Sequence, residues 1–129
     1  MAQNDLFSLD GQAAVVIGGG GVLAGAMASG FADAGADVAI VDLNGENAEK
    51  RAAAIREAGG RAIAIQANAA SKDDLIRARD TVLAEFGHVD ILLNAAGINS
   101  GTPFFEITEE EWQRILDVNL KSVFLACQV

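Results

Sequence analysis

The sequence predicts an α/β fold in which helices cover both faces of a parallel β-sheet. Short apolar runs alternate along the chain with longer stretches of helical periodicity, and short connections join them. Two parallel strands need a crossover between them, which is usually a helix, so this alternation favours a parallel sheet. Hydrophobic residues make up 51% of the composition and aromatic residues only 5%, which suits small side chains packed between layers. The length of 129 residues suffices for one domain, which we assign to residues 1–129.

The first half of the chain predicts two strands and two helices. The run Ala13–Ile17 is apolar throughout, as is typical of a strand buried on both faces of a sheet. Gly35 and Gly59 follow the two predicted helices, in the position where helices commonly end. The elements in order are a strand at 13–17, a helix at about 22–34, a strand at 37–41 that leads into Asp42, and a helix at about 46–58.

The second half repeats this alternation and ends in a helix. Ser71 precedes a turn with two acidic residues and is a favourable N-cap for a helix that runs to about Phe86. Thr108 and Glu111 have the spacing of a capping box, so a last helix begins there and runs toward the C-terminus. The elements in order are a strand at 62–65, a helix at about 72–86, a strand at 89–93, a long loop at 94–107, and the last helix.

These elements are expected to form a doubly wound, Rossmann-type sheet. The strand order would then be 3-2-1-4, with the topological switch point between the first and fourth strands. Ligands of such sheets bind at that point, beyond the carboxyl ends of the strands. The loops there are Gly18–Gly21 and Asn94–Gly97. We therefore expect the functional site between these two loops.

Charge and composition argue against several classes of partner. The formal net charge is −9 and the basic residues are scattered, whereas a nucleic-acid surface needs a clustered positive patch. Residues 1–5 lack the basic and apolar regions of a signal peptide, and no apolar run reaches the length of a membrane span. The single Cys127 excludes an internal disulfide. We expect a soluble cytoplasmic protein with no nucleic-acid, membrane or metal partner.

A run of four glycines lies between the first strand and the first helix. From Gly19 the sequence matches G-x-G-x-x-A, with Ala24 at the third small position. Glycine permits a tight turn in which backbone amides reach a pyrophosphate, and the following helix N-terminus adds free N–H groups. A flexible glycine connection is the alternative interpretation. A P-loop is excluded because no Gly-Lys-Ser/Thr follows the glycines.

Asp42 strengthens the nucleotide interpretation. It ends the second predicted strand, about 20 residues after the glycines, where a dinucleotide-binding domain carries the acid that binds the adenosine ribose. A carboxylate accepts hydrogen bonds from two ribose hydroxyls and repels a 2′-phosphate. Neither Leu43 nor Asn44 supplies a positive charge, so we expect NAD as the cofactor rather than NADP. The alternative is a solvated acid at a strand end.

Two motifs follow in the second half of the chain. Residues 90–97 are Asp-Ile-Leu-Leu-Asn-Ala-Ala-Gly, and residues 110–112, Glu-Glu-Trp, precede residues 117–124, Asp-Val-Asn-Leu-Lys-Ser-Val-Phe. In these segments the chain resembles the short-chain dehydrogenase/reductase family, whose fourth strand carries Asp-x-x-x-Asn-x-Ala-Gly.

The glycine segment departs from that family's Thr-Gly-x-x-x-Gly-x-Gly. Ile17 replaces the threonine, and Val22 and Ala24 replace the later glycines. Residues 22–28, Val-Leu-Ala-Gly-Ala-Met-Ala, are similar to a subgroup of sugar-acid reductases such as mannonate and fructuronate oxidoreductases.

The resemblance implies an oxidoreductase that transfers a hydride between a nicotinamide cofactor and an alcohol or carbonyl carbon. Asn119 stands where the family has the asparagine of its catalytic tetrad, which is thought to hold a water that relays protons to the catalytic lysine. Asn68 stands where relatives carry an aspartate that binds the adenine amino group. The residues expected at the cofactor are Gly18, Gly20, Gly21, Leu23, Asp42, Leu43, Asn68, Ala69, Asn94, Ala95, Ala96 and Gly97.

The resemblance also implies that the remaining catalytic residues lie outside this sequence. The chain has no tyrosine, and in the family the Tyr-x-x-x-Lys pair and its serine partner lie further along a longer chain. We therefore expect an N-terminal portion that binds the cofactor, lacks later strands of the sheet, and turns over little or no substrate by itself. In relatives the last helix packs against its copy, so we expect a homo-oligomer, either a dimer or a tetramer.

Two other functions remain open at this point. A non-catalytic nucleotide-binding or assembly module would use the same glycine loop and Asp42. A methyltransferase also places an acid on a ribose after a glycine loop, although Asn94–Gly97 argues against it. His88 is expected to be a surface turn residue and Cys127 a small packing residue.

Overall fold

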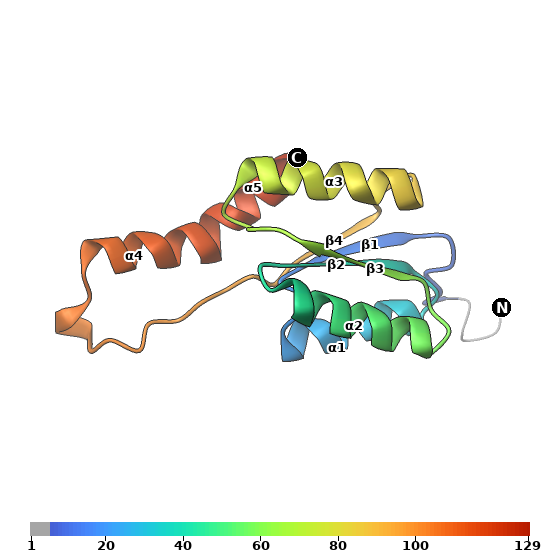
Figure 1. Ribbon diagram of the computed structural model, residues 1–129, viewed down its shortest axis with the longest axis horizontal. Coiled ribbons are helices and arrows are strands. Elements are labelled where there is room, and N and C mark those ends of the chain that lie inside the picture. The colour runs from blue at the N-terminus through green and yellow to red at the C-terminus, as the bar shows by residue number, and fades with distance from the viewer. Residues whose placement is uncertain (1–5) are drawn as a thin grey trace.

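The fold is a four-stranded parallel sheet with helices on both faces (Figure 1). The computed structural model describes residues 6–129 of the protein. The spatial strand order is β3-β2-β1-β4, and every neighbouring pair is parallel. This confirms the predicted order 3-2-1-4 and the Rossmann-type class. The strands are β1 Ala13–Ile17, β2 Asp37–Asp42, β3 Ala62–Gln66 and β4 Ile91–Asn94.

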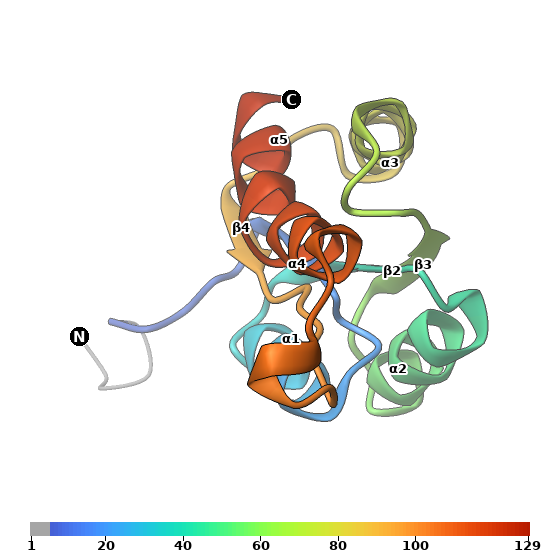
Figure 2. The ribbon, with the colours of Figure 1, turned by 90° about the vertical axis from the view of Figure 1, so that its left-hand side faces the viewer.

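Two helices lie on each face of the sheet (Figure 2). α1 Val22–Asp33 and α2 Gly45–Glu57 cover one face, while α3 Lys72–Phe86 and α5 Ser122–Gln128 cover the other. Alternate residues of β1 belong to different cores: Val16 packs with the α1 and α2 side, and Val15 with the α3 and α5 side. A strand packed on both faces has to be apolar throughout, which explains why β1 contains no polar residue.

The starts of three helices follow from their N-cap residues. The side chains of Asn44 and Ser71 accept hydrogen bonds from the backbone N–H groups of Asn47 and Asp74, and so cap α2 and α3. Thr108 accepts from the N–H of Glu111 in the same way. α1 differs, because it begins after Gly21 with no side-chain cap. The free N–H groups of its first turn are therefore available to a ligand.

The predicted last helix is wrong as a single element. α4 spans Glu109–Leu116, a π-helical turn spans Asp117–Lys121, and α5 follows it. A π-turn accommodates one extra residue without breaking the helix, and hydrophobic periodicity does not reveal it. The loop predicted at 94–107 contains a short 3₁₀ helix at Phe104–Glu106. This loop and α4 together form an arm that extends away from the sheet (Figure 1).

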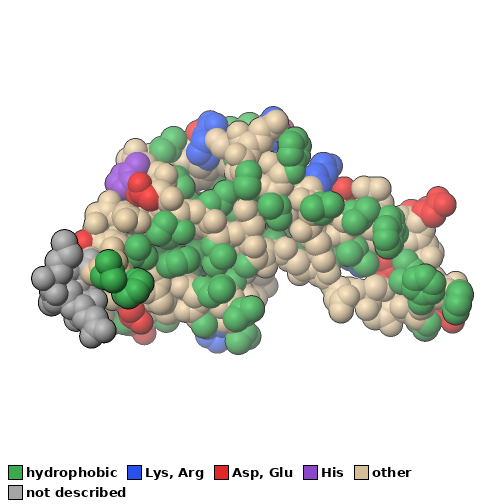
Figure 3. All heavy atoms as spheres, turned by 180° about the vertical axis from the view of Figure 1, so that it is seen from behind, with side chains coloured by type: hydrophobic (Ala, Val, Ile, Leu, Met, Phe, Trp, Pro, Cys, Tyr) green, Lys and Arg blue, Asp and Glu red, His purple; other side chains and the backbone are tan. Residues whose placement is uncertain are grey.

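β4 forms one edge of the sheet and pairs only with β1 among the described residues. It begins at Ile91, two residues later than predicted. Its Leu92 is 37% exposed and lines an apolar groove of about 310 Å³ with Val89 and Val129. Hydrophobic side chains gather on the face of the molecule seen from behind (Figure 3).

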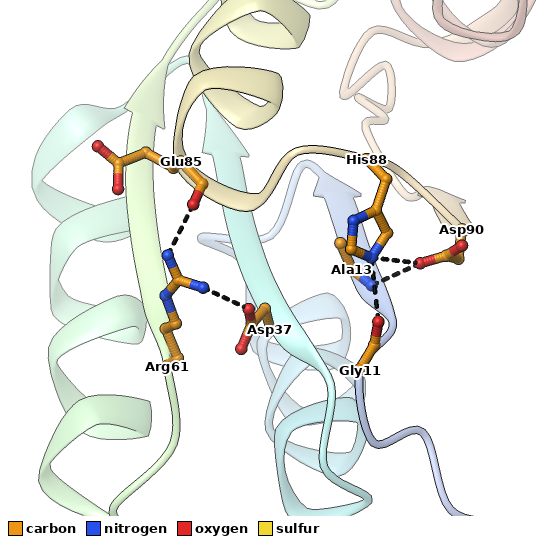
Figure 4. A network of polar contacts seen from close by, with 7 residues as sticks. All are labelled: Gly11, Ala13, Asp37, Arg61, Glu85, His88 and Asp90. Carbon is orange, nitrogen blue, oxygen red and sulfur yellow. Dashed lines mark hydrogen bonds and ion pairs between the residues drawn. The ribbon is translucent and has the colours of Figure 1, made fainter.

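A polar network ties the strands together at the end opposite their carboxyl ends (Figure 4). The carboxylate of Asp90 accepts from the N–H of Ala13, at 2.8 Å, before β4 begins. His88 Nε2 lies 3.0 Å from the carbonyl oxygen of Gly11 and 3.1 Å from Asp90 Oδ2. Arg61 donates to Asp37 and to the carbonyl of Glu85. His88 is therefore a turn residue remote from the predicted site.

Candidate functional site

A cleft of about 360 Å³ lies beyond the carboxyl ends of the strands, between the loops that follow β1, β2, β3 and β4. This is the switch-point position predicted from the sequence. Most of the predicted cofactor residues line it, namely Gly18, Gly21, Asp42, Leu43, Asn68, Ala69, Ala95, Ala96 and Gly97. The predicted residues that do not line it are Gly20, Leu23, Asn94 and Asn119.

Gly18 lies where two loops of the cleft meet. Its φ of +79° is in the left-handed region, and its N–H donates to the carbonyl of Val41 at 2.7 Å. A Cβ at this position would lie 2.7 Å from the backbone nitrogen of Ala96. Glycine is therefore required both by the backbone conformation and by the close approach of the second loop. The flexible-connection interpretation does not explain this double constraint.

Asp42 ties the end of β2 to the glycine loop. Its Oδ2 accepts from the N–H of Gly20 at 3.0 Å, and its Oδ1 accepts from the N–H of Asn44 at 2.9 Å. A Cβ at Gly20 would lie 2.8 Å from that Oδ2, so glycine permits the contact. A carboxylate has further lone pairs, and Asp42 can still accept hydrogen bonds from ligand hydroxyls in the cleft.

Val22 and Ala24, which replace glycines of the family's pattern, do not block the cleft beside the glycine turn. The side chain of Val22 points into solvent, and Ala24 is buried in the core between the sheet and α1. Gly21 has an ordinary backbone conformation, with φ of −69°. The side chain of Leu23 is 75% exposed, outside the cleft lining. The conformation that needs glycine is therefore found at Gly18, not at the replaced positions.

Asn68 is held by the first turn of α3. Its N–H donates to Asp74 Oδ2 at 2.8 Å, and its own Oδ1 accepts from the N–H of Ala70 at 2.9 Å. The backbone hydrogen bond from Asn68, with help from Arg77 and Ser71, lowers the pKa of Asp74. The amide oxygen expected to bind adenine is thus already shared with a turn. Sequence reasoning missed Asp74, although an acid in the first helical turn was the available signal.

Asn119 is placed by the π-helical turn and bonds to the loop after β4. Its Oδ1 accepts from the N–H of Ile98, and its Nδ2 donates to the carbonyl of Ile98, both at 2.8 Å. This pair of bonds fixes the wall formed by Ala95–Ile98. Asn119 itself lies behind the wall, while its neighbour Val118 lines the cleft.

Asn94 lies at the end of β4, next to α5. Its Nδ2 is 3.7 Å from the sulfur of Cys127, and its buried Oδ1 has no hydrogen-bond partner among residues 6–129. Sequence reasoning did not identify Asn47, Ala67, Ile98 and Val118, which also line the cleft. Ile98 and Val118 adjoin predicted residues in the sequence, so extending the motifs by one position would have found them. No cluster of potential metal ligands occurs in the described part of the chain.

The fold and this site define a class of protein. A glycine turn before an uncapped helix, an acid at the end of β2 and a cleft at the switch point are the features of a dinucleotide-binding α/β domain. The sequence model of the short chain dehydrogenase family matches residues 12–129. The chain belongs to the short chain dehydrogenase family, as its motifs predicted.

Several relatives act on sugar-derived compounds, according to their names. The chain is 39% identical over 122 residues to a D-threitol dehydrogenase of Mycolicibacterium smegmatis, covering 95% of this chain and 47% of that protein. It is 34% identical over 125 residues to a 5-keto-D-gluconate 5-reductase of Escherichia coli, covering 97% and 49%.

Solved structures give the same picture of the fold. A short-chain type dehydrogenase/reductase from Mycobacterium marinum superposes with a TM-score of 0.94 at 33% identity, covering 99% of this chain and 52% of that one. A putative D-mannonate oxidoreductase from Haemophilus influenza with bound NAD gives a TM-score of 0.91 at 27% identity, covering 98% and 51%. The chain thus spans about half the length of the proteins it matches.

Proposed function

We propose that residues 1–129 are the NAD-binding portion of a dehydrogenase. The complete protein would transfer a hydride between the nicotinamide C4 of the cofactor and an alcohol or carbonyl carbon. Membership of the short chain dehydrogenase family supports the reaction class. The choice of NAD as the cofactor rests on one observation, that the carboxylate of Asp42 lies in the cleft at the C-terminal end of β2.

The residues of the cleft fit a dinucleotide. The uncapped first turn of α1 offers N–H groups and a partial positive charge to a pyrophosphate. Gly18 allows the loops after β1 and β4 to approach each other at the floor of this site, since a Cβ there would clash with the backbone of Ala95 and Ala96. Asp42 faces the adenosine ribose in this arrangement, and the wall Ala95–Ile98 faces the nicotinamide half.

The absence of a basic residue beside Asp42 supports NAD over NADP. The 2′-phosphate of NADP would lie against a carboxylate, and Leu43 and Asn44 offer no positive charge to offset the repulsion. The ribose of NAD carries a hydroxyl there, which donates a hydrogen bond to the carboxylate.

Titration calorimetry of this chain with NAD and NADP tests the proposal. Asp42→Ala should weaken NAD binding about tenfold or more, because it removes hydrogen bonds to a charged acceptor, and should change NADP binding much less. Asp42→Asn keeps an acceptor for the N–H of Gly20 and separates the charge from the structural contact. Asp33→Ala, at an exposed acid near the far end of α1, is the matched control.

The possible outcomes separate two errors. Equal losses for NAD and NADP in Asp42→Ala would contradict the NAD assignment. Failure of the unaltered chain to bind either dinucleotide would contradict the proposed function itself.

The cofactor, once bound, would supply the hydride acceptor or donor, and this chain would supply the cofactor-binding site. Asn119 is the one member of the family's catalytic tetrad expected in this sequence, and its role there remains a prediction. Its two bonds to Ile98 support a part in holding the wall beside the nicotinamide. The general acid/base would come from another part of the complete protein, because no tyrosine occurs among these 129 residues.

The substrate and the assembly are proposed on different grounds. A sugar alcohol or a keto sugar acid is supported by the names of the D-threitol dehydrogenase and 5-keto-D-gluconate 5-reductase relatives. A homo-oligomer through α4 and α5 is supported by the exposed apolar side chains of Trp112, Leu120 and Phe124.

We place the protein in the cytoplasm, with the single cysteine as support. No helix in residues 6–129 is both long and apolar enough to cross a membrane.

A further inference from the structure

The carboxylate of Glu111 connects α4 to the segment that leads away from the cleft. Its Oε1 accepts from Ser100 Oγ at 2.6 Å and from Thr102 Oγ1 at 3.0 Å. Ser100 Oγ also accepts from the N–H of Thr102 at 3.1 Å. These three contacts form a closed network in which one oxygen atom of Glu111 holds two loop residues.

This contact replaces the second half of the expected capping box. Thr108 accepts from the N–H of Glu111, as a capping box requires. The Glu111 side chain, however, is hydrogen-bonded to Ser100 and Thr102, in the loop that precedes α4 in the chain. The carboxylate thus joins two segments, and its role is not explained by helix capping.

The segment 98–102 is held at both of its ends by residues of α4 and of the π-helical turn. Asn119 holds Ile98 through two hydrogen bonds, and Glu111 holds Ser100 and Thr102. Ile98 lines the cleft on the side formed by the loop after β4. Ser100, which is bonded to Glu111, lies only two residues after Ile98. Loss of the Glu111 contacts should therefore loosen the wall of the cleft at Ile98.

Residues 98–103 contain no charged side chain, since their sequence is Ile-Asn-Ser-Gly-Thr-Pro. Within the described chain, Glu111 is the charged group that bonds to them, and Arg114 on the same helix acts on its charge. A Cβ at Gly101 would meet nothing within 4 Å, so the middle of the segment is not fixed by packing. The hydrogen bonds of Glu111 therefore constrain Ser100 and Thr102, and those of Asn119 constrain Ile98.

We propose that Glu111 is a positioning residue whose ionised carboxylate fixes residues 98–102 and thereby holds Ile98, the last residue of the Ala95–Ile98 wall, on the substrate side of the cleft. The inference rests on the proposed function for one point, that the reacting end of the cofactor lies opposite Asp42. The fixing of the segment itself depends only on the contacts described above.

The ionisation of Glu111 gives the segment a pH dependence. Hydrogen bonds from Ser100 and Thr102, with a smaller effect of Arg114, lower the pKa of Glu111 below its ordinary value. A lowered pKa in the folded state means that the ionised form is the one stabilised by these contacts. The stabilisation of residues 98–102 by the Glu111 carboxylate is fully present above the ordinary pKa of glutamate. It is lost as the pH falls through the lowered pKa.

Amide hydrogen exchange of the ¹⁵N-labelled chain tests the structural part. Glu111→Ala should speed exchange at Thr102 about tenfold or more at neutral pH, because its partner Ser100 is released. Glu111→Gln keeps an acceptor oxygen but does not titrate, so its segment should stay protected with no loss toward acid pH. Glu110→Gln, at the preceding exposed position, is the matched control and should behave as the unaltered chain.

Exchange at core amides of β1 and β2 shows whether the fold persists in each sample. Protection of Thr102 in Glu111→Ala equal to that of the unaltered chain at neutral pH would overturn the proposal. So would loss of protection in Glu110→Gln as large as that in Glu111→Ala, with the core amides unchanged.

Steady-state kinetics of the complete protein tests the substrate side. Glu111→Ala should raise KM for the alcohol about tenfold and KM for NAD much less, and Glu111→Gln should restore KM for the alcohol. An unchanged KM for the alcohol would overturn the assignment of this wall to the substrate. NAD binding by the unaltered chain is measured separately. Its absence would contradict the proposed function, whereas an unchanged KM for the alcohol in the presence of NAD binding would contradict only this inference.

Discussion

At the residue scale, Gly18 carries a double constraint, from its positive φ and from the backbone of the loop after β4. The loops after β1 and β4 approach each other there, and the N–H of Gly18 is already bonded to Val41. Asp42 closes the loop on its other side through Gly20. The glycine turn is therefore a rigid part of the site, held by backbone contacts on two sides, and its shape exists before any ligand binds.

Gly18→Ala should lower the free energy of unfolding by about 1–3 kcal/mol, since alanine must adopt a strained backbone conformation, and the new Cβ would clash with Ala96. Urea denaturation measures the change, and NAD binding should be lost with it. Gly30→Ala is the matched control. It lies within α1 with nothing within 4 Å of the new Cβ, and helix propensity should raise the stability by roughly 0.5–1 kcal/mol. Equal stability of the two variants would contradict this account.

At the scale of elements, the first turn of α3 supports the side of the cleft that Asn68 lines. Asp74 holds the backbone of Asn68 and forms an ion pair with Arg77. These contacts lower its pKa, the bond from Asn68 being the first cause. Because the pKa is lowered in the folded state, the stability they contribute is present above the ordinary pKa of aspartate and lost as the pH falls through the lowered value.

Asp74→Ala should therefore weaken NAD binding roughly two- to fivefold, a small effect because the pair is at the surface. Its free energy of unfolding should be below that of the unaltered chain at neutral pH, and the two should converge in acid. Chemical denaturation across the pH range measures this. Asp73→Ala changes the other acid of the same turn and is the matched control for NAD binding. If Asp74→Ala and the unaltered chain still differed in free energy of unfolding at pH values below the titration of Asp74, the proposed role of the ionised Asp74 carboxylate would be contradicted.

The same elements show how far sequence carries the prediction. β1 and the central residues of β2 were predictable because strand residues buried on both faces of a sheet must be apolar. The loops at the carboxyl ends of β1, β2 and β4 followed from the parallel order. The π-helical turn at Asn119 was not predictable, because one inserted residue leaves the apolar pattern intact. The bonds of Asn119 to Ile98 and of Glu111 to Ser100 join distant segments, so spacing along the chain does not reveal them.

At the scale of the whole molecule, two apolar surfaces are open to solvent. One is the edge of β4, where Leu92 lines the groove beside α5. The other lies along α4, the π-helical turn and α5, where Trp112, Leu120 and Phe124 are 60%, 66% and 61% exposed. Contiguous apolar surface of this kind is a common mark of association. The two surfaces differ in kind, because the strand edge also offers unpaired backbone groups.

We expect the chain to self-associate through this second surface, formed by α4, the π-helical turn and α5. Phe124→Glu should raise the dimer dissociation constant at least about tenfold, as removal of a central aromatic anchor does. Leu92→Lys introduces a charge at the β4 edge instead and should leave association unchanged. Sedimentation equilibrium measures both, with circular dichroism as the check that each variant folds. If Leu92→Lys produced monomers and Phe124→Glu did not, the edge of β4 would be the dimer interface. The surface of α4, the π-helical turn and α5 would then not be the interface. The charge of −9 predicts that added salt strengthens the dimer, since two like-charged copies repel each other less when screened.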